Sequence, residues 1–555
     1  MCAALSLVAS SSRTVSAQRV LGIGEDATVL PRGAARITAH GGWTTYNELY
    51  GPGGKLEALG APFTTDSLGA AQLEFLRPLQ TTLRQLALQP DANVTLGPAR
   101  TDFSARIARS SISVDVGLTS RLMFSARLPY EHTISEVVMN VNPRLELDHP
   151  ANIAPNPALV PTGTAAARNG RVVDSLFRAI GELRTRLGGC ATTPGDAVCN
   201  DRARVEALLQ SATAFATGVA RTYGTGTDTT PGSVFVPLAG STLQTAIAAR
   251  VAALNASFKT YIPQLGVWDT PVPAPTPTSA GEASAIISDT LGIAPIGLVD
   301  RSHIGDIELG AKLLVFDTFG GIAGARSAGR RSGARFAVGG LVRLGTGQID
   351  RPNELADIGT GDGQTDIEAN GALDVVFGRR WWASVIGRYG LQLEDEQVMR
   401  IPDVARNPFA AGYREQTVAR DLGDYIEIEA TPRLVYNDYL SASVQWLYRR
   451  KAEDTYAGTF VVDVPDADPV SVDAGILGLG SEQSEQRVGG GLTFSTLRAF
   501  DRGRARLPFE VQLFHSQTLS GEGYVPKRFT TQVQLRYYTR LFGPPLRPRP
   551  STPAR

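Results

Sequence analysis

The sequence predicts an all-β transmembrane antiparallel β-barrel of about twelve strands, with an α-helical insertion that forms a cap or a plug. From Gly305 to the C-terminus, apolar and polar residues alternate over stretches of about ten to fourteen residues, the length of a tilted membrane strand. No window approaches the ~18 continuous apolar residues of a membrane helix. A membrane protein of this composition therefore crosses by strands, whose backbone groups are satisfied in a closed barrel.

Twelve segments carry this alternation. In chain order they are Ala35–Tyr46, Ala108–Leu118, Leu122–His132, His303–Phe316, Arg335–Gly345, Thr365–Phe377, Trp381–Leu393, Tyr425–Tyr436, Tyr439–Lys451, Glu485–Ser495, Leu507–Thr518 and Phe529–Leu541. Short turns such as Thr119-Ser120-Arg121 and Asn437-Asp438 alternate with long connections, as in outer-membrane barrels with both termini on the periplasmic side. We expect one barrel over residues 35–542, closed by pairing the first strand with the last.

The ends of the chain differ from the barrel. Residues 1–17 have the apolar run and the small-x-small site, Val15-Ser16-Ala17, of a secretory signal peptide. The basic residues that normally open such a signal are missing, which suggests a true start several codons earlier; lipidation at Cys2 is the less favoured alternative. Residues 543–555 form a Pro/Arg-rich tail.

Two long connections carry helical periodicity. Residues 47–107 contain the helical candidate Ser67–Leu88, and the insertion 133–302 contains three more. Those three are Arg171–Leu187, Arg202–Tyr223 and Ser241–Ile262. Their apolar faces must pack on something, either on one another as an external cap or in the barrel as a plug. Apolar side chains of the insertion are candidates for docking an apolar solute: Leu208, Leu209, Phe215, Leu254 and Phe258.

The insertion also holds two cysteines nine residues apart, Cys190 and Cys199. In an exported protein this spacing predicts a small disulfide, worth about 2–3 kcal/mol by loop closure. Two free thiols are the alternative.

Side chains along a strand face the lumen and the lipid in turn, and this alternation identifies candidate lumen-lining charges. They are Asp306, Glu308, Lys312, Arg335, Arg343, Asp366, Glu368, Asp374, Arg388, Glu427, Glu429, Arg433, Arg487, Glu510 and Arg536. An ion-selective pore would show an excess of one sign, whereas this balanced set predicts cross-strand ion pairs that brace the wall. For each charge, a bracing role and contact with a solute remain open, with bracing favoured. The outward aromatic residues predict interfacial girdles: Trp43, Trp381, Trp446 and Tyr537.

Other functional classes find little support. Lys plus Arg equals Asp plus Glu, 54 each, so no nucleic-acid partner is expected. His515 and Ser516 are adjacent in a strand and face opposite ways, and parity places His40 in the lumen and His515 outside. We therefore expect no catalytic residues, no metal and no cofactor. The acidic loop Asp350–Asp366 lacks EF-hand spacing and is better explained as a solvated turn than as a Ca²⁺ site.

Three segments carry a family resemblance: Gly305–Lys312, Phe336–Gly347 and Gly361–Asp366. They resemble outer-membrane proteins linked to phenol degradation by the meta pathway, which are relatives of the FadL-type transporters for hydrophobic molecules. The resemblance covers the barrel and implies transport. FadL-type barrels carry Asn-Pro-Ala in an N-terminal hatch, whereas here Asn156-Pro157-Ala158 lies inside the long insertion.

Together these patterns predict an integral outer-membrane protein that passively passes small hydrophobic molecules. Its expected partners are outer-membrane lipid, the small apolar solute and, during biogenesis, the barrel-assembly machinery. The main alternative is a surface structural or interaction protein that the barrel merely anchors. A lipid-modifying outer-membrane enzyme is the second alternative, and it would need a nucleophile, a base and an orienting group near the outer rim.

Overall fold

The predicted twelve-stranded antiparallel barrel is confirmed. The computed structural model describes residues 25–143, 150–226, 231–318, 332–378, 380–465 and 468–542, so the predicted signal peptide and the Pro/Arg tail lie outside the described residues. The barrel strands follow one another around the ring in chain order. They are β1 (Ala34–Tyr46), β4 (Ala99–Gly117), β5 (Leu122–Val141), β9 (Ile307–Asp317), β10 (Ser332–Leu344), β11 (Asp366–Phe377), β12 (Trp381–Gln392), β15 (Tyr425–Val435), β16 (Leu440–Lys451), β20 (Gln483–Ser495), β21 (Phe509–Glu522) and β23 (Phe529–Arg540).

The ring closes between its first and last strands. β1 pairs with β23 in an antiparallel register that runs from Ala34 opposite Arg540 to Thr45 opposite Phe529. β1 also pairs with β4 along its other edge, so neither edge of this strand is left open. Closure matters because an unpaired edge in lipid would leave backbone groups without hydrogen-bond partners.

Along each barrel strand, successive side chains point alternately to the outside of the ring and into the lumen. On β23, Val533 and Leu535 are 42% and 46% exposed on the outside of the ring, while Gln532 and Gln534 line the internal cavity. One parity is therefore available to lipid and the other to the lumen, as the pleat requires.

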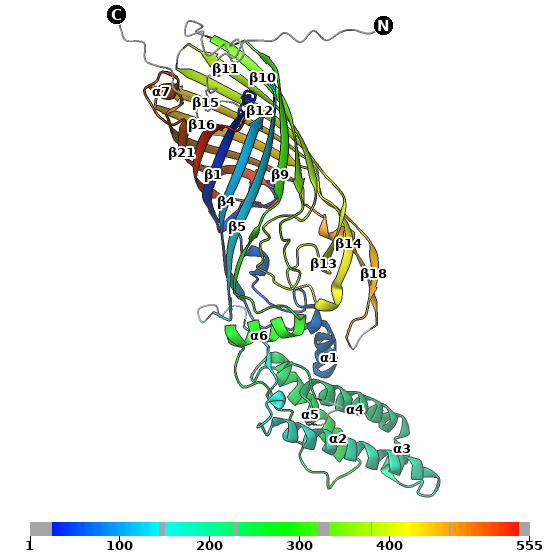
Figure 1. Ribbon diagram of the computed structural model, residues 1–555. Helices are drawn as coiled ribbons and strands as arrows, with labels where there is room; N and C mark the ends of the chain where they lie inside the picture. The colour runs from blue at the N-terminus through cyan, green and yellow to red at the C-terminus, as the bar shows by residue number, and fades with distance from the viewer. Residues whose placement is uncertain are drawn as a thin grey trace, which may run out of the picture.

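Two strands continue well past the barrel. β4 and β5 remain paired from the short turn at Gly117 out to Ala99 and Val141, some nine residues beyond the ends predicted from the sequence. There β8 (Leu298–Ile304) pairs with the outer half of β5, and β9 pairs with its inner half. Figure 1 shows this ribbon extending from the barrel toward the helices.

The long connections build small sheets at the same end. These sheets were not predicted. Two have three strands each: β13 (Asp395–Arg400) with β14 (Glu415–Asp421) and β17 (Thr455–Ala457), and β2 (Glu48–Tyr50) with β3 (Leu56–Ala58) and β22 (Val525–Pro526). Two have two strands each: β18 (Thr459–Val462) with β19 (Val470–Asp473), and β6 (Ile153–Pro155) with β7 (Phe235–Pro237). The short 3-10 helices are η1 (Pro52–Gly54), η2 (Ala61–Phe63), η3 (Glu74–Leu76), η4 (Pro157–Leu159), η5 (Gly189–Ala191), η7 (Gly412–Arg414) and η8 (Ala474–Leu477).

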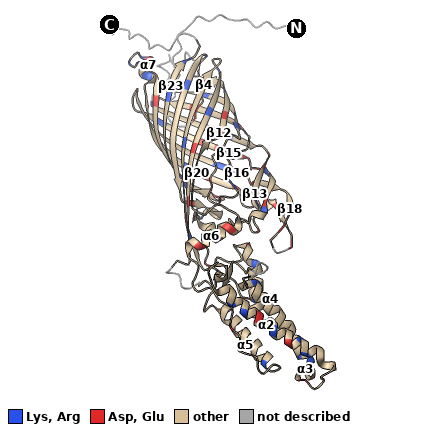
Figure 2. Ribbon diagram, turned by 60° about the horizontal axis from the view of Figure 1, so that its bottom comes forward, with Lys and Arg blue, Asp and Glu red and all other residues tan. Residues whose placement is uncertain are grey.

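Most helices form an arm beyond the long-loop end of the barrel (Figure 1). It contains α2 (Ala165–Gly188), α3 (Ala197–Asn200), α4 (Arg202–Tyr223) and α5 (Thr242–Lys259). The arm stands outside the lumen, so the insertion is an external domain and does not plug the barrel. Figure 2 shows charges of both signs along these helices. None of the described helices is long and apolar enough to cross a membrane.

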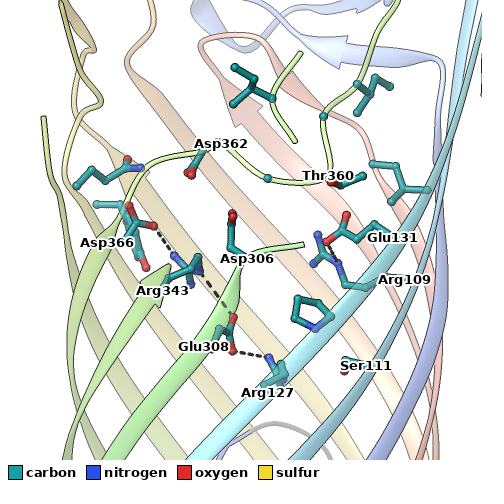
Figure 3. Close-up of a pocket in the computed structure, with 18 of the residues that line it drawn as sticks. Arg109, Ser111, Arg127, Glu131, Asp306, Glu308, Arg343, Thr360, Asp362 and Asp366 are labelled. Carbon is teal, nitrogen blue, oxygen red and sulfur yellow. Dashed lines mark hydrogen bonds and ion pairs between the residues drawn. The ribbon is translucent and has the colours of Figure 1, made fainter. Parts of the chain in front are cut away.

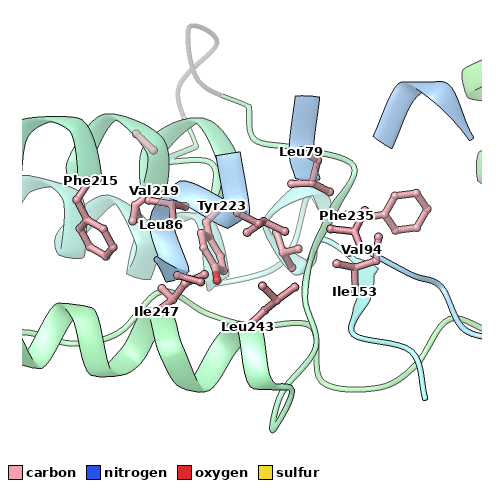
Figure 4. Close-up of a cluster of buried hydrophobic side chains, with 14 of the residues drawn as sticks. Leu79, Leu86, Val94, Ile153, Phe215, Val219, Tyr223, Phe235, Leu243 and Ile247 are labelled. Atoms are coloured by element: carbon pink, nitrogen blue, oxygen red, sulfur yellow. The ribbon is translucent and has the colours of Figure 1, made fainter. Parts of the chain in front are cut away.

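The arm has a hydrophobic core of its own. α1 (Arg77–Ala87) comes from the first long connection and packs against both α4 and α5. Figure 4 shows Leu79 and Leu86 of α1 among the side chains of these two helices. Of the five side chains expected to dock a solute, Leu209, Phe215, Leu254 and Phe258 are at most 8% exposed in this core, and Leu208 packs against it partly buried. That docking hypothesis is wrong, because the helices bury these faces against one another.

Local chemistry explains two differences in the helices. The predicted helix Ser67–Leu88 begins only at Arg77, where Pro78 occupies the first turn; before it, the backbone of Leu68 pairs with Gly97 and Leu96. The helix α6 (Ala280–Leu291) was not predicted. It begins with a capping box between Ser279 and Glu282, whose hydrogen bonds lower the pKa of the Glu282 carboxyl.

The tip of the arm is cross-linked. Cys190 and Cys199 form a disulfide with their Cα atoms 5.5 Å apart, and Arg186 of α2 pairs with Asp196 in the same loop at 2.7 Å. Asn156 of the Asn-Pro-Ala triplet accepts a 2.9 Å bond from the backbone N–H of Ala158. This asparagine has a local capping role within the insertion.

The last barrel strand provides a test of the inside and outside faces. Leu535→Arg should destabilise the protein in lipid by about 2–4 kcal/mol, because the outward position would place a cation in hydrocarbon. Gln534→Arg is the matched control, since residue 534 faces a lumen already rich in ions. Unfolding by denaturant in liposomes measures both, and equal stabilities would contradict the assigned faces.

Candidate functional site in the barrel lumen

The barrel encloses a cavity of about 1120 Å³ at its long-loop end. Side chains from strands all around the ring line it, together with residues of the connection 345–365 and of the sheet β13-β14-β17. The wall is polar, with many charged groups of both signs. Figure 3 shows part of this lining, with carboxylates and guanidinium groups directed into the same space.

One network of ion pairs joins four neighbouring strands. Arg343 of β10 binds Asp366 of β11 at 2.6 Å and lies 3.7 Å from Glu308 of β9. Glu308 continues to Arg127 of β5 at 3.0 Å. The dashed lines in Figure 3 trace this chain. Because each charge finds its counterion on an adjacent strand, the network braces the wall as the balanced parity pattern predicts.

A second network of ion pairs lies on the strands β12 and β15 of the barrel wall. Arg388 of β12 pairs with Glu427 and, at 3.0 Å, with Glu429 of β15. Nearby, the hydroxyl of Tyr425 donates a 2.7 Å hydrogen bond to Glu368. A guanidinium group can serve several carboxylates through its five N–H donors, which explains how one arginine holds two strands together.

Residues 25–30 occupy the lumen at the short-turn end. Glu25 lies 3.6 Å from Arg388, and the carbonyl of Asp26 accepts a 3.1 Å bond from Lys312 Nζ. The amide of Ala27 donates to Asp374 at 3.2 Å. Ala27, Val29 and Leu30 are at most 2% exposed. A smaller cavity of about 150 Å³ remains beside this segment, so the lumen narrows sharply there.

Asp374 and Arg335 form the firmest anchor for this segment. The two side chains pair at 2.6 Å and are 0% and 2% exposed. Arg335 also donates to the hydroxyl of Thr28, and Ser384 donates to Asp374 at 2.6 Å. A buried pair of this kind is stable only when further hydrogen bonds satisfy both partners, and here the inward segment supplies one of them. Residues 25–30 carry no strand or helix period, so the sequence did not predict their place in the lumen.

The predicted lumen charges all lie in the barrel interior or in its ion pairs. Ten of them line one of the two cavities: Asp306, Glu308, Lys312, Arg343, Asp366, Glu368, Arg388, Glu427, Glu429 and Arg536. Asp374, Arg335, Arg433 and Glu510 are buried in the wall at 0–2% exposure, and Arg487 lies 3.3 Å from Glu485. Whether any of them contacts a solute stays a prediction.

The acidic connection 345–365 is not the solvated turn expected from its sequence. It folds inward over the mouth of the lumen, where Asp357 is buried against Arg301 of β8. Thr133 of β5 donates to the carbonyl of Ile358 at 3.0 Å. The nearby Asp350 side chain is exposed and accepts a hydrogen bond from the amide of Gly359. Tertiary contacts with β5 and β8 hold this loop inside, and local turn propensity could not show them.

The remaining predicted residues lie as follows. Trp43, Trp381, Trp446 and Tyr537 are 39–56% exposed, and a girdle role for them stays a prediction. His40 lines the cavity, whereas His515 is exposed and bonds Thr531 at 2.9 Å, so the two do not form a catalytic pair. Among the described residues no group of acids, histidines and cysteines has metal-binding geometry.

Comparisons with known proteins give a distant likeness. No family model matches the chain, and no curated protein sequence matches it. An outer-membrane channel from Pseudomonas putida F1 is 9% identical and aligns over 93% of this chain and 99% of its own, with a TM-score of 0.41. The Pseudomonas putida toluene transporter TodX is 10% identical over 94% and 96%, with a TM-score of 0.24. The translocator domain of the autotransporter NalP from Neisseria meningitidis is 7% identical over 91% and 88%, with a TM-score of 0.26.

The inward loop offers a test. Arg301→Ala should leave the Asp357 carboxylate buried without its cation, a change that costs about 3–5 kcal/mol at buried pairs. We expect residues 345–365 to loosen and to become sensitive to limited proteolysis. The matched control is Arg351→Ala in the same loop, because Arg351 is 54% exposed in its pair with Glu354 and such pairs contribute about 0–1 kcal/mol. Equal protease resistance of both variants would show that Arg301 does not hold the loop.

Proposed function

We propose that this protein is an integral outer-membrane channel that passively passes small hydrophobic molecules. The carrying observation is the cavity of about 1120 Å³ inside a closed barrel, whose far end is closed by residues 25–30. That closure consists of hydrogen bonds and ion pairs to barrel side chains, so it can open without breaking the ring. The barrel wall and its closure thus supply the two parts of a gated passage.

The wall chemistry supports passage without strong ion selection. Arg343, Arg388 and Arg127 are each engaged by carboxylates of neighbouring strands, so their charges are largely compensated locally. A selective ion channel needs rings or an excess of one sign. The charged groups of this lumen are already bonded to one another. An apolar molecule can therefore pass without breaking or replacing those bonds.

The orientation follows from the two ends of the barrel. The turn between β4 and β5, the start of β1 and the end of β23 lie at one end, and the arm lies at the other (Figure 1). In outer-membrane barrels short turns face the periplasm and long loops face outward. We therefore place both strand termini on the periplasmic side, the arm outside the cell, and lipid and the barrel-assembly machinery among the partners.

A surface anchor is the second candidate function. The arm stands clear of the lumen and buries a large hydrophobic core, which includes Leu176 and Ile247 at 0% exposure. An arm that does not gate the barrel is what an interaction module would require. The two functions predict different results when the lumen closure and the arm are altered separately.

The closure is the feature to test for transport. The double variant Glu25→Ala/Asp26→Ala removes the Glu25 carboxylate, which lies 4.0 Å from Lys312 and 3.6 Å from Arg388, and the Asp26 carboxylate, which accepts a hydrogen bond from the amide of Thr28. We expect several-fold higher leakage of small solutes from liposomes, with little cation or anion preference. Uptake of a hydrophobic tracer should rise in parallel.

The matched control is Asp91→Ala/Asp102→Ala, which removes the same charge from exposed positions outside the lumen. Deletion of residues 165–259, which contain the helices α2 to α5, should leave leakage near the wild-type value, because the arm lies outside the passage. If the closure variant leaks no more than its control and moves no more tracer, the transport function is wrong and the anchor function is favoured.

A further inference from the structure

Three side chains of the kinds that hydrolases use meet on the outside of the barrel, where β5 pairs with β8. His132 of β5 lies with its Nε2 atom 2.7 Å from a carboxylate oxygen of Asp300 of β8. Ser302 of β8 lies directly opposite His132 in the same pairing. His132 and Asp300 are 168 positions apart along the chain, so no short motif in the sequence predicted this group. The pairing of the two strands brings the serine, the histidine and the aspartate together.

All three side chains point away from the lumen. Glu131 of β5 lines the lumen cavity, and Figure 3 shows its side chain directed into that space. Arg301 of β8 is buried against the inward loop 345–365. Because side chains alternate along a strand, His132, Asp300 and Ser302 lie on the outer face. The side chains of His132 and Asp300 are 39% and 58% exposed, and Ser302 is exposed as well.

The group lies beside the apolar outer face of the barrel. Trp43 of β1 is opposite Ala108 of β4, and Ala108 is opposite His132, so one row of paired residues leads from an expected girdle tryptophan to this histidine. Tyr130, two residues nearer the short turn on the same face of β5, is 50% exposed. In the orientation proposed above, a lipid of the outer leaflet has its acyl chains against this face and its ester groups beyond them.

Ser302 and His132 form the closer of the two kinds of cross-strand pair. Just after β8, the amide of Gly305 donates to the carbonyl of Pro129 at 3.1 Å. Hydrogen-bonded and non-hydrogen-bonded pairs alternate along an antiparallel ladder. Ser302 lies an odd number of positions before Gly305, so its pair with His132 is of the non-hydrogen-bonded kind, in which the Cβ atoms are about 4.5–5.5 Å apart or closer.

This spacing places the serine hydroxyl within reach of the histidine ring. A rotation about the Cα–Cβ bond of Ser302 is enough to turn its Oγ toward His132. The two side chains are not hydrogen-bonded to each other in the structure, and contacts between a nucleophile and its base are often loose until the substrate binds. The strand register thus fixes the two groups as neighbours and leaves the final contact to a side-chain rotation.

The pair with Asp300 leaves one ring nitrogen of His132 available as a base. An ionised carboxylate only accepts hydrogen bonds, so in the neutral ring the hydrogen is carried by Nε2, which faces Asp300. Nδ1 then keeps its lone pair. Asp300 in this arrangement orients the ring and stabilises the imidazolium that forms when Nδ1 takes a proton.

The amide of Ser302 is placed to stabilise an oxyanion. Among the described strands β8 is at the edge of its sheet, with β5 on one side and none on the other. The alternation set by Gly305 turns the backbone of Ser302 away from β5. The same holds for Ile304, whose carbonyl accepts a 3.1 Å hydrogen bond from the hydroxyl of Thr360. In serine hydrolases the N–H of the nucleophile itself is one of the oxyanion donors.

We propose that Ser302, His132 and Asp300 cleave fatty acyl esters of outer-leaflet lipids, an activity beyond the proposed transport function and independent of it. Ser302 Oγ attacks the ester carbonyl while His132 Nδ1 takes the hydroxyl proton. The bond to the alcohol oxygen then breaks, and His132 returns the proton to that oxygen. Water next attacks the acyl-serine with His132 again as the base, which releases the fatty acid and restores Ser302.

The neighbouring residues indicate a lipid that carries phosphate. Arg106 of β4 is exposed on the same outer face, opposite Ile134 of β5, and Ile134 is opposite Asp300. A guanidinium group binds phosphate oxygens well. Leu128 and Tyr130, both 50% exposed on β5, offer an apolar surface for the acyl chains. Glycerophospholipids and lipid A share this chemistry of a phosphate near a fatty acyl ester.

Fatty-acid release from defined lipids tests the proposal. The full chain is incubated in detergent micelles with phosphatidylethanolamine carrying labelled acyl chains, and separately with labelled lipid A. We expect release of fatty acid by the wild-type protein, none above background by Ser302→Ala, and at least about a hundredfold lower rate in His132→Asn. Ser104→Ala is the matched control, since Ser104 is exposed on the same face but lies opposite Glu136.

The outcomes separate the lipids and the idea itself. Release from one lipid alone identifies the source of the ester. Equal release by the wild-type protein and Ser302→Ala would assign the activity to a contaminant, and no release from either lipid would show that the group is only a surface ion pair; either result overturns the proposal. Heat-dependent mobility in SDS gels verifies that each variant contains a folded barrel.

A covalent probe locates the nucleophile. Hexadecanesulfonyl fluoride should form a sulfonate ester with Ser302 Oγ, with loss of fluoride, and mass spectrometry of the digested wild-type protein should place the adduct there. An adduct only on other residues would contradict the assignment. For Asp300, which acts through His132, we expect Asp300→Asn to lower kcat with little change in KM and Asp300→Glu to recover part of the rate.

The activity and the transport function can fail separately. Ser302→Ala should leave tracer uptake and leakage in liposomes unchanged, because Ser302 faces away from the lumen. Fatty-acid release without tracer uptake would retain the esterase and remove the channel, whereas tracer uptake without fatty-acid release would do the reverse.

Discussion

The closed ring of backbone hydrogen bonds is the constraint on which the rest of the structure depends. In hydrocarbon an unpaired amide or carbonyl costs several kcal/mol, so the first and last strands must meet. The register between β1 and β23, from Ala34–Arg540 to Thr45–Phe529, meets this requirement. Once the ring is closed, each strand has one face outside and one inside, and every inward polar side chain must find a partner within the lumen.

The charges of the lumen follow from that confinement. A buried ion without a counterion is strongly disfavoured, and the inward acids and bases are arranged as cross-strand pairs such as Arg343–Asp366 and Arg335–Asp374. Residues 25–30 join the same system, since Asp374 accepts their backbone as well as Arg335. The groups that brace the wall therefore also hold residues 25–30 in place.

The outer end of the molecule is organised by apolar packing. The arm shares one buried cluster with the outer ends of β4 and β5 and with Phe409, and the outer sheets have a second cluster of their own. The inward loop 345–365 is tied to this assembly through Arg301 and Thr133. Arg400 and Pro352 of the long connections line the large cavity and also a smaller hollow among those connections.

The sequence by itself determined the barrel: the strand positions, their inside and outside faces, and the closing pair. It could do so because lipid on one side imposes a strict alternation that is visible within each strand, as in Phe529–Arg540. The helices α2, α4 and α5 were visible for the same local reason. Only the tertiary structure decided that the arm stands outside, that Leu209 and Phe258 are core residues, that residues 345–365 fold inward and that residues 25–30 lie inside the lumen. Those outcomes depend on contacts between distant segments, such as Lys312 with Asp26 and Arg301 with Asp357, which leave no periodic trace along the chain.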